Sequence, residues 1–498
     1  MDIEAFRKAG YKAIDDICDY YYSLQEKSVV SNVKPGYLAE LVPSEPPVKG
    51  EPFQNIANDY QKLIVPGLTH WQHPSFFAYY PTACTFEGML GDLYASSASN
   101  PGFNWYASPA CTELEVIVMD WAAKLLGLGP AFWNSSGVGG GCIQSTASDA
   151  ALIAIVAARS LYQRTHPDVE LDKLVIYTTT QTHSLGLKAG LILGLQVRAL
   201  EVTSGDKFGL RGETLRKALE ADTKAGKHPF ILVATVGTTS SGAVDNLAEI
   251  KTVAVKYPSL WIHVDAAWAG VAMVCPEYRE QCYLQDINDI AHSFCTNFHK
   301  WGLVNFDAST LWVRDRKYLT EALDVTPPFL RTAEGDAGRV IDYRNWHLAL
   351  GRKFRSLKFW FVIRSYGIEG FQKYIRQSIS LNESFAEKIS QSKHLEHVTP
   401  PSFALSVFRL VPKLDSQRVF TLDELNGLNK QYYARISSRK DIALTQTVLN
   451  GVSCIRLAVG AAQTTKEHIE KASALLNEEA EEALKVWLET SSSGQSPN

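Results

Sequence analysis

A glycine-rich stretch in the first third of the chain could bind a phosphate. The run "SSGVGGGCIQSTASDAALIAIVAARS" leads into a predicted helix whose N-cap region is Thr146, Ala147 and Ser148. Free N–H groups at a helix N-terminus, together with two hydroxyl groups, form a suitable site for an anion. No GK[ST] follows, and Cys142 stands where the last glycine of GxGxxG would be, so neither nucleotide-binding motif is indicated. An ordinary capped helix is the alternative.

Three further residues with useful chemistry follow predicted strands or precede one. Asp265 ends the apolar run of "IHVDAAWAG", where a carboxylate either pairs with a cation such as a protonated ring nitrogen or caps the next turn. Lys300 lies beside aromatic residues in "TNFHKWG". A partly buried lysine has a lowered pKa and can form a Schiff base, although a structural lysine is the alternative. His183 in "TTTQTHSLGLKAG" could be structural when taken alone.

Taken together, these groups are the parts that hold pyridoxal 5′-phosphate (PLP). An aspartate keeps the ring nitrogen protonated, a lysine binds the aldehyde, and a helix N-terminus anchors the phosphate. With these parts in this order, the chain resembles the group II PLP-dependent aromatic L-amino acid decarboxylases, a fold-type I family of intertwined homodimers with shared active sites. The resemblance covers about residues 1–485 and rests on "HPSFFAYYPTA", "GFNWYASPACTELE", "HVDAAWAG", "NFHKW" and "DYRNWHLALGRKFRSLKFW".

The resemblance implies a role for each matching residue. Lys300 would bind the cofactor, Asp265 would pair with its ring nitrogen, and His183 would lie over its ring. The other implied cofactor contacts are Ala147, Ser148, Thr238, Ala267 and His299, and the implied substrate contacts are Thr82, Tyr79, Gly351 and the partner subunit's Phe103.

Two details of these motifs bear on the support of the site and on the substrate. "NFHKWG" departs from the family's usual "NPHKWL" at Phe298 and Gly302, which leaves the catalytic pair intact but could reshape its support. Gly351 leaves room for an indole, which favours tryptophan among the aromatic amino acids, although it could merely permit close helix packing.

Phe329 occupies a position that decides the product. In the family, a tyrosine in a "P-x-Y-L-K/R" segment protonates the carbanion after CO2 leaves, whereas this chain has "PPFLR". A phenyl ring has no exchangeable proton, so dioxygen can attack instead, as in relatives that resemble aromatic acetaldehyde synthases. We therefore expect an arylacetaldehyde, CO2, ammonia and hydrogen peroxide, with dioxygen as co-substrate. The alternative is a plain decarboxylase giving the arylalkylamine, with His183 or water as proton donor; Tyr343 would need a different loop register.

The elements that must position these residues follow from the hydrophobic pattern. From about residue 110 to 315, β-branched runs such as "KLVIYTTT" and "FILVATVGTT" alternate with helical stretches, which is typical of an α/β fold with a mainly parallel sheet. Ligands bind beyond the carboxyl ends of such strands. We expect a dimer-intertwining N-terminal arm (1–85), a large PLP-binding domain (86–370), a small C-terminal α+β domain (371–488) and a disordered tail (489–498).

The N-terminal arm could pack on either of two surfaces. An amphipathic helix over residues 1–24, followed by a proline-rich stretch, could pack on a partner subunit or on its own subunit.

A net charge of −4 in 498 residues gives no reason to expect nucleic acid or an anionic membrane as a partner. No apolar run of about 18 residues is present, and we expect a cytoplasmic enzyme without a metal site. Intact Lys300 and Asp265 argue against a non-catalytic binding protein.

Overall fold

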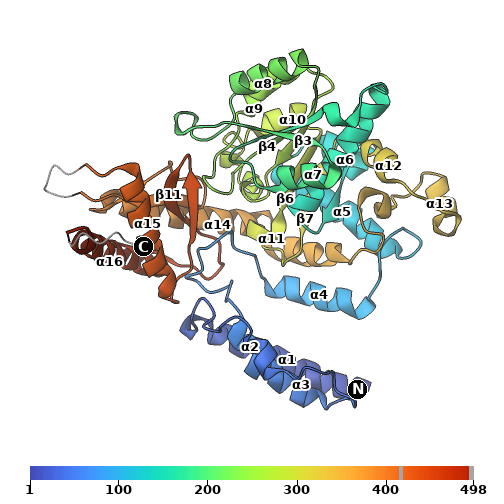
Figure 1. Cartoon of the computed structure of the whole chain (residues 1–498). Coiled ribbons are helices and arrows are strands. Elements are labelled where there is room, and N and C mark those ends of the chain that lie inside the picture. The colour runs from blue at the N-terminus through green and yellow to red at the C-terminus, as the bar shows by residue number, and fades with distance from the viewer. Residues whose placement is uncertain (414–418, 493–498) are drawn as a thin grey trace.

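The computed structural model describes residues 1–413 and 419–492 of the chain, which form helices around one large and one small sheet (Figure 1). The strands are β1 (Gly140–Gln144), β2 (Leu174–Thr179), β3 (Gln196–Leu200), β4 (His228–Thr235), β5 (Trp261–Asp265), β6 (Ser293–Asn297), β7 (Ser309–Val313), β8 (Leu395–His397), β9 (Leu405–Leu410), β10 (Thr445–Leu449) and β11 (Val452–Ala458). The helices are α1 (Ile3–Tyr22), α2 (Tyr37–Leu41), α3 (Phe53–Asp59), α4 (Phe86–Ala98), α5 (Pro109–Leu126), α6 (Ala147–Thr165), α7 (Leu185–Leu193), α8 (Gly212–Lys224), α9 (Leu247–Ala254), α10 (Leu284–Ile290), α11 (Phe298–Trp301), α12 (Lys317–Leu323), α13 (Ala333–Asp336), α14 (Arg355–Gln391), α15 (Leu422–Ser438) and α16 (Lys466–Ser492).

The large sheet has seven strands in the order β1-β7-β6-β5-β4-β2-β3. Strands β6, β5, β4, β2 and β3 pair in parallel, and β7 is antiparallel to both of its neighbours. Alternate residues of one strand join two different cores: Val175 and Tyr177 of β2 pack in one, and Leu174 and Ile176 in the other. Because both faces of the sheet are covered, its central strands β2 and β4 contain nearly continuous buried apolar runs. The predicted α/β fold with a mainly parallel sheet is confirmed.

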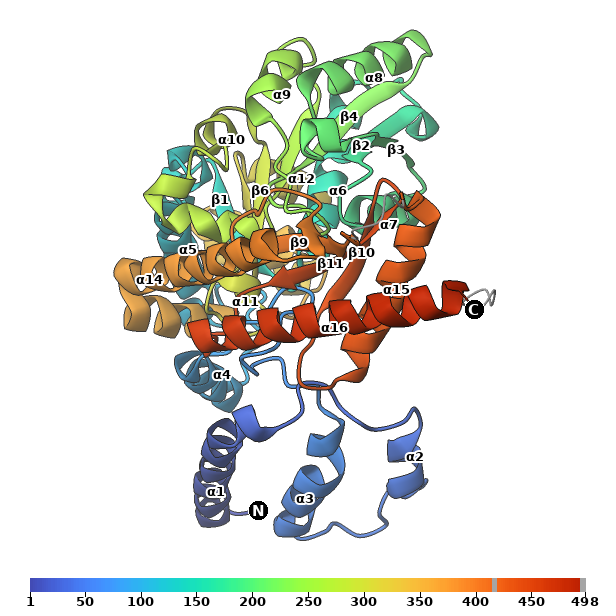
Figure 2. The ribbon, with the colours of Figure 1, turned by 90° about the vertical axis from the view of Figure 1, so that its left-hand side faces the viewer.

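The C-terminal part forms a second, antiparallel sheet in the order β10-β11-β9-β8. Helices α15 and α16 pack against each other, and α15 also packs on β9 and β11. The long helix α14 leads into this part and packs against α4 and α5, and Figure 2 shows it lying alongside the small sheet. Helix α16 continues to Ser492, so residues 489–492, expected in a disordered tail, are helical; residues 493–498 lie outside the described residues.

The first helices project from the rest of the chain on one side (Figures 1 and 2). The expected N-terminal helix forms as α1, but none of its residues is buried, and Phe6 is 60% exposed. A groove of about 1580 Å³ separates α1 from α4 and is lined by apolar side chains of both helices, among them Ile14, Leu90 and Leu93. The single chain therefore leaves the apolar stripe of α1 without a cover. In the described part of the chain, each helix is too short or too polar to cross a bilayer.

Candidate active site

A cavity of about 200 Å³ with several polar side chains in its lining lies at the carboxyl ends of β4, β5 and β6. This is the edge at which ligands bind in open parallel sheets. The cavity is lined by Tyr80, Thr146, Ala147, Ser148, His183, Leu185, Thr235, Gly237, Thr239, Asp265, Ala267, Trp268, Asn297, His299 and Lys300. The four separate stretches that carry the predicted chemistry are therefore brought together in one place.

The N-terminus of α6 forms one end of the cavity. Thr146 caps this helix, because its hydroxyl oxygen accepts a hydrogen bond from the Asp149 N–H at 3.1 Å. The N–H groups of Ala147 and Ser148 belong to the first turn, where a helix has no internal acceptors to offer. The partial positive charge of a 19-residue helix favours an anion at this end. The residues expected at the phosphate thus have the chemistry that a phosphate needs.

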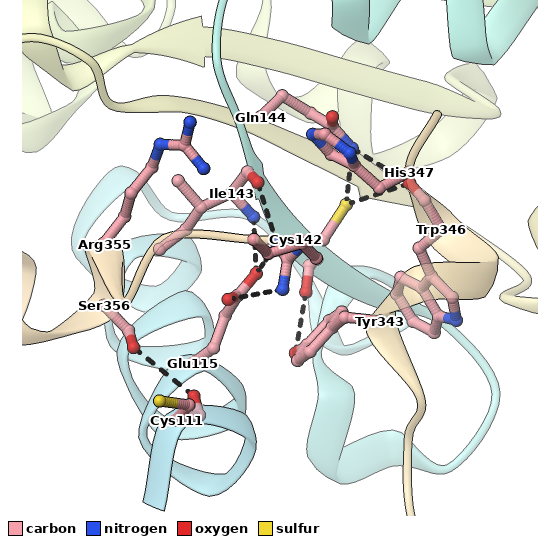
Figure 3. Close-up of polar contacts among 12 residues, drawn as sticks. Cys111, Glu115, Cys142, Ile143, Gln144, Tyr343, Trp346, His347, Arg355 and Ser356 are labelled. Carbon is pink, nitrogen blue, oxygen red and sulfur yellow. Dashed lines mark hydrogen bonds and ion pairs between the residues drawn. The ribbon is translucent and has the colours of Figure 1, made fainter. Parts of the chain in front are cut away.

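The strand that leads into this helix is held from outside the sheet by a buried polar network (Figure 3). Strand β1 is at the sheet edge, so half of its backbone groups face away from β7. Glu115 accepts from the Ile143 N–H at 2.8 Å, and Arg352 donates to the Ile143 carbonyl at 2.9 Å. Arg352 also forms two hydrogen bonds with the Glu115 carboxylate, at 2.6 and 2.9 Å. Tyr343 donates to the Gly141 carbonyl at 3.2 Å.

This network also anchors the segment that follows Phe329. Trp346 lies between Tyr343 and Arg352 in the sequence, and its backbone carbonyl accepts a hydrogen bond from Gln144 Nε2 at 3.0 Å. The chain between α13 and α14 is therefore held against β1, the strand that precedes α6. Tyr343 is 1% exposed and hydrogen-bonded within this network, so it does not lie on the surface loop with Phe329.

Asp265 and Lys300 form the charged part of the cavity. Asp265 ends β5, is 3% exposed, and accepts at Oδ1 from the Ala267 N–H at 3.0 Å. Lys300 lies in the short helix α11, with its Nζ 5.4 Å from the centre of the Tyr80 ring. Burial lowers the pKa of the Lys300 ammonium, and the Asp265 carboxylate opposes this shift. A lysine with a lowered pKa has more of the unprotonated amine, which is the nucleophilic form.

Two histidines line the same cavity and differ in their surroundings. His183 keeps an exposed edge in the single chain, and burial lowers its pKa while Asp265 acts in the opposite direction. His299 is buried, which lowers its pKa to about 3. Its Nδ1 accepts from the Ala308 N–H at 2.8 Å, so the neutral ring of His299 carries its proton on Nε2.

Two side-chain atoms of cavity-lining residues are available to bind a polar ligand. Thr235 Oγ1 and Asn297 Oδ1 are buried and have no hydrogen-bond partner in the described part of the chain. Buried polar atoms normally form hydrogen bonds, so two such atoms without a partner indicate a ligand that supplies hydrogen-bonding groups. The residues present therefore fit PLP, whose phosphate, ring nitrogen and aldehyde need an anion site, a carboxylate and an amine.

Seven lining residues were not among those expected from sequence: Tyr80, Leu185, Thr235, Gly237, Thr239, Trp268 and Asn297. Thr235 and Asn297 are the last residues of β4 and β6, so the rule that ligands bind at strand ends could have found them. Tyr80 lies in the motif "HPSFFAYYPTA" and stacks on Trp268, with ring centres 4.4 Å apart. Their place in the cavity comes from packing between distant segments.

The remaining expected site residues do not line this cavity. The Thr238 hydroxyl lies 2.7 Å from Ser241 Oγ and accepts from the Ala243 N–H, so it stabilises a turn. Phe329 lies in a short 3-10 turn, η10 (Pro328–Leu330), and is 81% exposed. The other four lie in the first third of the chain or just before α14 and are exposed or half-buried: Tyr79, Thr82, Phe103 and Gly351.

Comparison with known proteins gives a consistent result. Residues 35–411 match the pyridoxal-dependent decarboxylase conserved domain. The chain is 43% identical to tryptophan decarboxylase 2 of Oryza sativa subsp. japonica over 97% of this chain and 96% of that protein. It is also 43% identical to phenylacetaldehyde synthase of Arabidopsis thaliana, over 96% of each chain. The crystal structure of Oryza sativa TDC with PLP and tryptamine superposes with a TM-score of 0.93 at 35% identity, covering 97% of this chain and 99% of that one.

Proposed function

The chain belongs to the pyridoxal-dependent decarboxylase family, among the aromatic amino acid decarboxylases and phenylacetaldehyde synthases, and we propose that it couples decarboxylation of an aromatic L-amino acid to oxidative deamination. The amino acid, dioxygen and water give an arylacetaldehyde, CO2, ammonia and hydrogen peroxide. Two electrons leave the carbon that bears the nitrogen and reduce dioxygen to peroxide, while water supplies the aldehyde oxygen and displaces ammonia.

The cavity supports the decarboxylation half of this proposal. When bound, PLP supplies a protonated pyridine ring that accepts the electron pair left as CO2 departs. Asp265 would hold the proton on the ring nitrogen, and the lowered pKa of Lys300 would increase the share of free amine for the cofactor aldehyde. The N–H groups of Ala147 and Ser148 would hold the phosphate. His183 would lie over the ring, and Ala267 and His299 would line it.

Phe329 is the observation that carries the oxidative half. After CO2 leaves, the electron pair on the substrate carbon must take a proton or pass to an oxidant. A tyrosine hydroxyl at this position would be a positioned general acid, whereas a phenylalanine ring has no proton to give. Loss of this acid lengthens the time during which dioxygen can react with the electron-rich carbon.

We further propose that the enzyme is a homodimer with shared active sites. The uncovered apolar faces of α1 and α4 support a second copy as their cover, because a stripe of this size on a monomer would remain in water. Residues 1–85 would intertwine the two subunits. This arrangement would bring the partner subunit's Phe103 to the substrate, beside Thr82 and Tyr79. Sedimentation that gave an active monomer at low concentration would argue against it.

The preferred substrate in this proposal is tryptophan. A side chain built at Gly351 would meet no atom within 4 Å, which is consistent with room for an indole. The same glycine is exposed in the single chain, so its neighbours in a dimer would decide how much of this room remains.

A plain decarboxylase that releases the arylalkylamine is the second candidate. His183 favours it, because a neutral imidazole lining the cavity can relay a proton to the substrate carbon in place of the missing tyrosine.

The stoichiometry of the reaction tests the proposal. The purified holoenzyme would be supplied with each aromatic L-amino acid in turn, while CO2, oxygen uptake, peroxide, ammonia, aldehyde and amine are measured together. We expect aldehyde, peroxide and ammonia in equal amounts to CO2, with matching oxygen uptake. Formation of amine alone, without oxygen uptake, would establish the second candidate, and absence of CO2 with every substrate would exclude both.

A further inference from the structure

We propose that Cys295 is a positioning residue, whose thiol holds one oxygen of the Asp265 carboxylate so that the other oxygen is directed to the ring nitrogen of the cofactor. The inference rests on the proposed function only in assuming that PLP binds in the cavity. It adds a residue that lies behind the catalytic carboxylate and does not touch the cofactor itself.

The pairing of two neighbouring strands brings the thiol and the carboxylate together. Asp265 of β5 and Cys295 of β6 are register partners in a parallel pair, so their side chains lie on the same face of the sheet. Cys295 Sγ is 3.6 Å from Asp265 Oδ1 and donates to it. The Ala267 N–H donates to the same oxygen. In the described part of the chain, no donor contacts Asp265 Oδ2, which is therefore the oxygen left for a ligand.

The thiol stays a donor under all ordinary conditions. Burial raises the pKa of Cys295 well above its usual range, and the adjacent Asp265 carboxylate raises it further. A thiol is a weaker donor than an amide or a hydroxyl group. It therefore orients the carboxylate without neutralising it, and a hydroxyl group at the same place could do the same.

A purely structural role for Cys295 makes a different prediction. The side chain is 0% exposed and packs in the same core as Ala147 and Leu185. If only packing mattered, Cys295→Ala would be tolerated better than Cys295→Ser, because serine places a hydroxyl among apolar neighbours. If hydrogen bonding to Asp265 matters, serine replaces the donor and alanine does not, so the order is reversed.

The test compares Cys295→Ala and Cys295→Ser with the wild type. Cys282→Ala is the matched control, since Cys282 is also 0% exposed but lies in the other core. Each protein would be freed of cofactor and titrated with PLP, following the visible absorbance of the bound cofactor, and the unfolding temperature of each apoprotein would be measured in parallel. The kcat and KM of the reloaded enzymes would then be determined.

We expect Cys295→Ala to bind PLP about fivefold to tenfold more weakly, as for loss of one ordinary hydrogen bond. Its bound cofactor should show a shifted visible absorbance, and its kcat should fall while KM is unchanged. Cys295→Ser should restore the PLP affinity and kcat, and Cys282→Ala should match the wild type in both.

Two results would overturn the inference. One is a PLP affinity and absorbance of Cys295→Ala equal to those of the wild type. The other is a PLP affinity that follows apoprotein stability, with serine worse than alanine. Either result leaves the proposed function standing, whereas failure of the wild type itself to bind PLP would remove the proposed function.

Discussion

Replacing Phe329 by tyrosine should convert the enzyme from an aldehyde producer into an amine producer. The ring is 81% exposed in η10, so the added hydroxyl meets solvent and the stability should change by no more than about 0.5 kcal/mol. A positioned general acid speeds proton transfer by roughly 10²–10⁴-fold. Because protonation and oxidation compete for the same electron-rich carbon, the ratio of amine to aldehyde should rise by at least about 100-fold.

The assay measures both products and oxygen uptake in the same reaction mixture. The wild type, Phe329→Tyr and Phe329→Leu would be compared at equal CO2 release. Leucine is the control, since it changes the side chain at the same exposed position without adding a proton donor. We expect Phe329→Leu to keep the aldehyde as its product and to consume oxygen in step with CO2.

The reasoning would be refuted by a tyrosine variant with an unchanged ratio of amine to aldehyde and undiminished oxygen uptake. The same conclusion would follow if Phe329→Leu produced mainly amine, because the product would then not depend on a proton donor at residue 329. An inactive tyrosine variant would also contradict the expected tolerance of an exposed side chain.

Three further predictions concern stability, pH and substrate. Glu115→Gln alone, or Arg352→Met alone, should lower the free energy of unfolding by about 3–5 kcal/mol in chemical denaturation, because each variant leaves a buried charge unpaired. The double variant should be more stable than the sum of the two losses predicts. Losses that simply add would contradict the role of the pair. Burial lowers the pKa of His263 from 6.5 to about 4. As the pH falls from 6.5 to about 4, the unfolded chain binds a proton that the folded chain does not, so the free energy of unfolding decreases. His263→Gln should flatten the dependence of the urea midpoint on pH over that window, and an unchanged slope would assign the loss to other groups. Gly351→Ser should lower kcat/KM for tryptophan relative to tyrosine by about tenfold, because an indole would lose space. Equal effects on both substrates would show that residue 351 does not lie beside the substrate side chain.

The cofactor part of the site was accessible from local sequence because each residue follows a strand or begins a helix. Asp265 could be recognised as a carboxylate that ends an apolar strand, and Ala147 and Ser148 as the first turn of a helix after a glycine-rich run. Parallel strands bring their carboxyl ends to one edge of the sheet, so position along each strand was enough to group them. The cavity at that edge contains all three, together with Lys300.

Other contacts could not be predicted from the sequence, because they join segments that no local sequence pattern connects. The Thr238 hydroxyl lies 2.7 Å from Ser241 Oγ within a turn, and only the backbone path through that turn brings the two together. Tyr80 reaches Lys300 from a segment more than two hundred residues away, and a sequence offers no rule for such a pair.

The sequence by itself determined the chemical parts of this protein: the mainly parallel α/β fold, a lysine amine and an aspartate carboxylate beside predicted strands, and the N-terminus of a helix after a glycine-rich run. These follow from residue types and strand or helix periodicity, which act over a few neighbouring residues. Only the tertiary structure decided which groups share a cavity, that Cys295 donates to Asp265, and that Glu115 and Arg352 hold β1. Those contacts depend on strand register and on the packing of distant segments, which are properties of the whole folded chain.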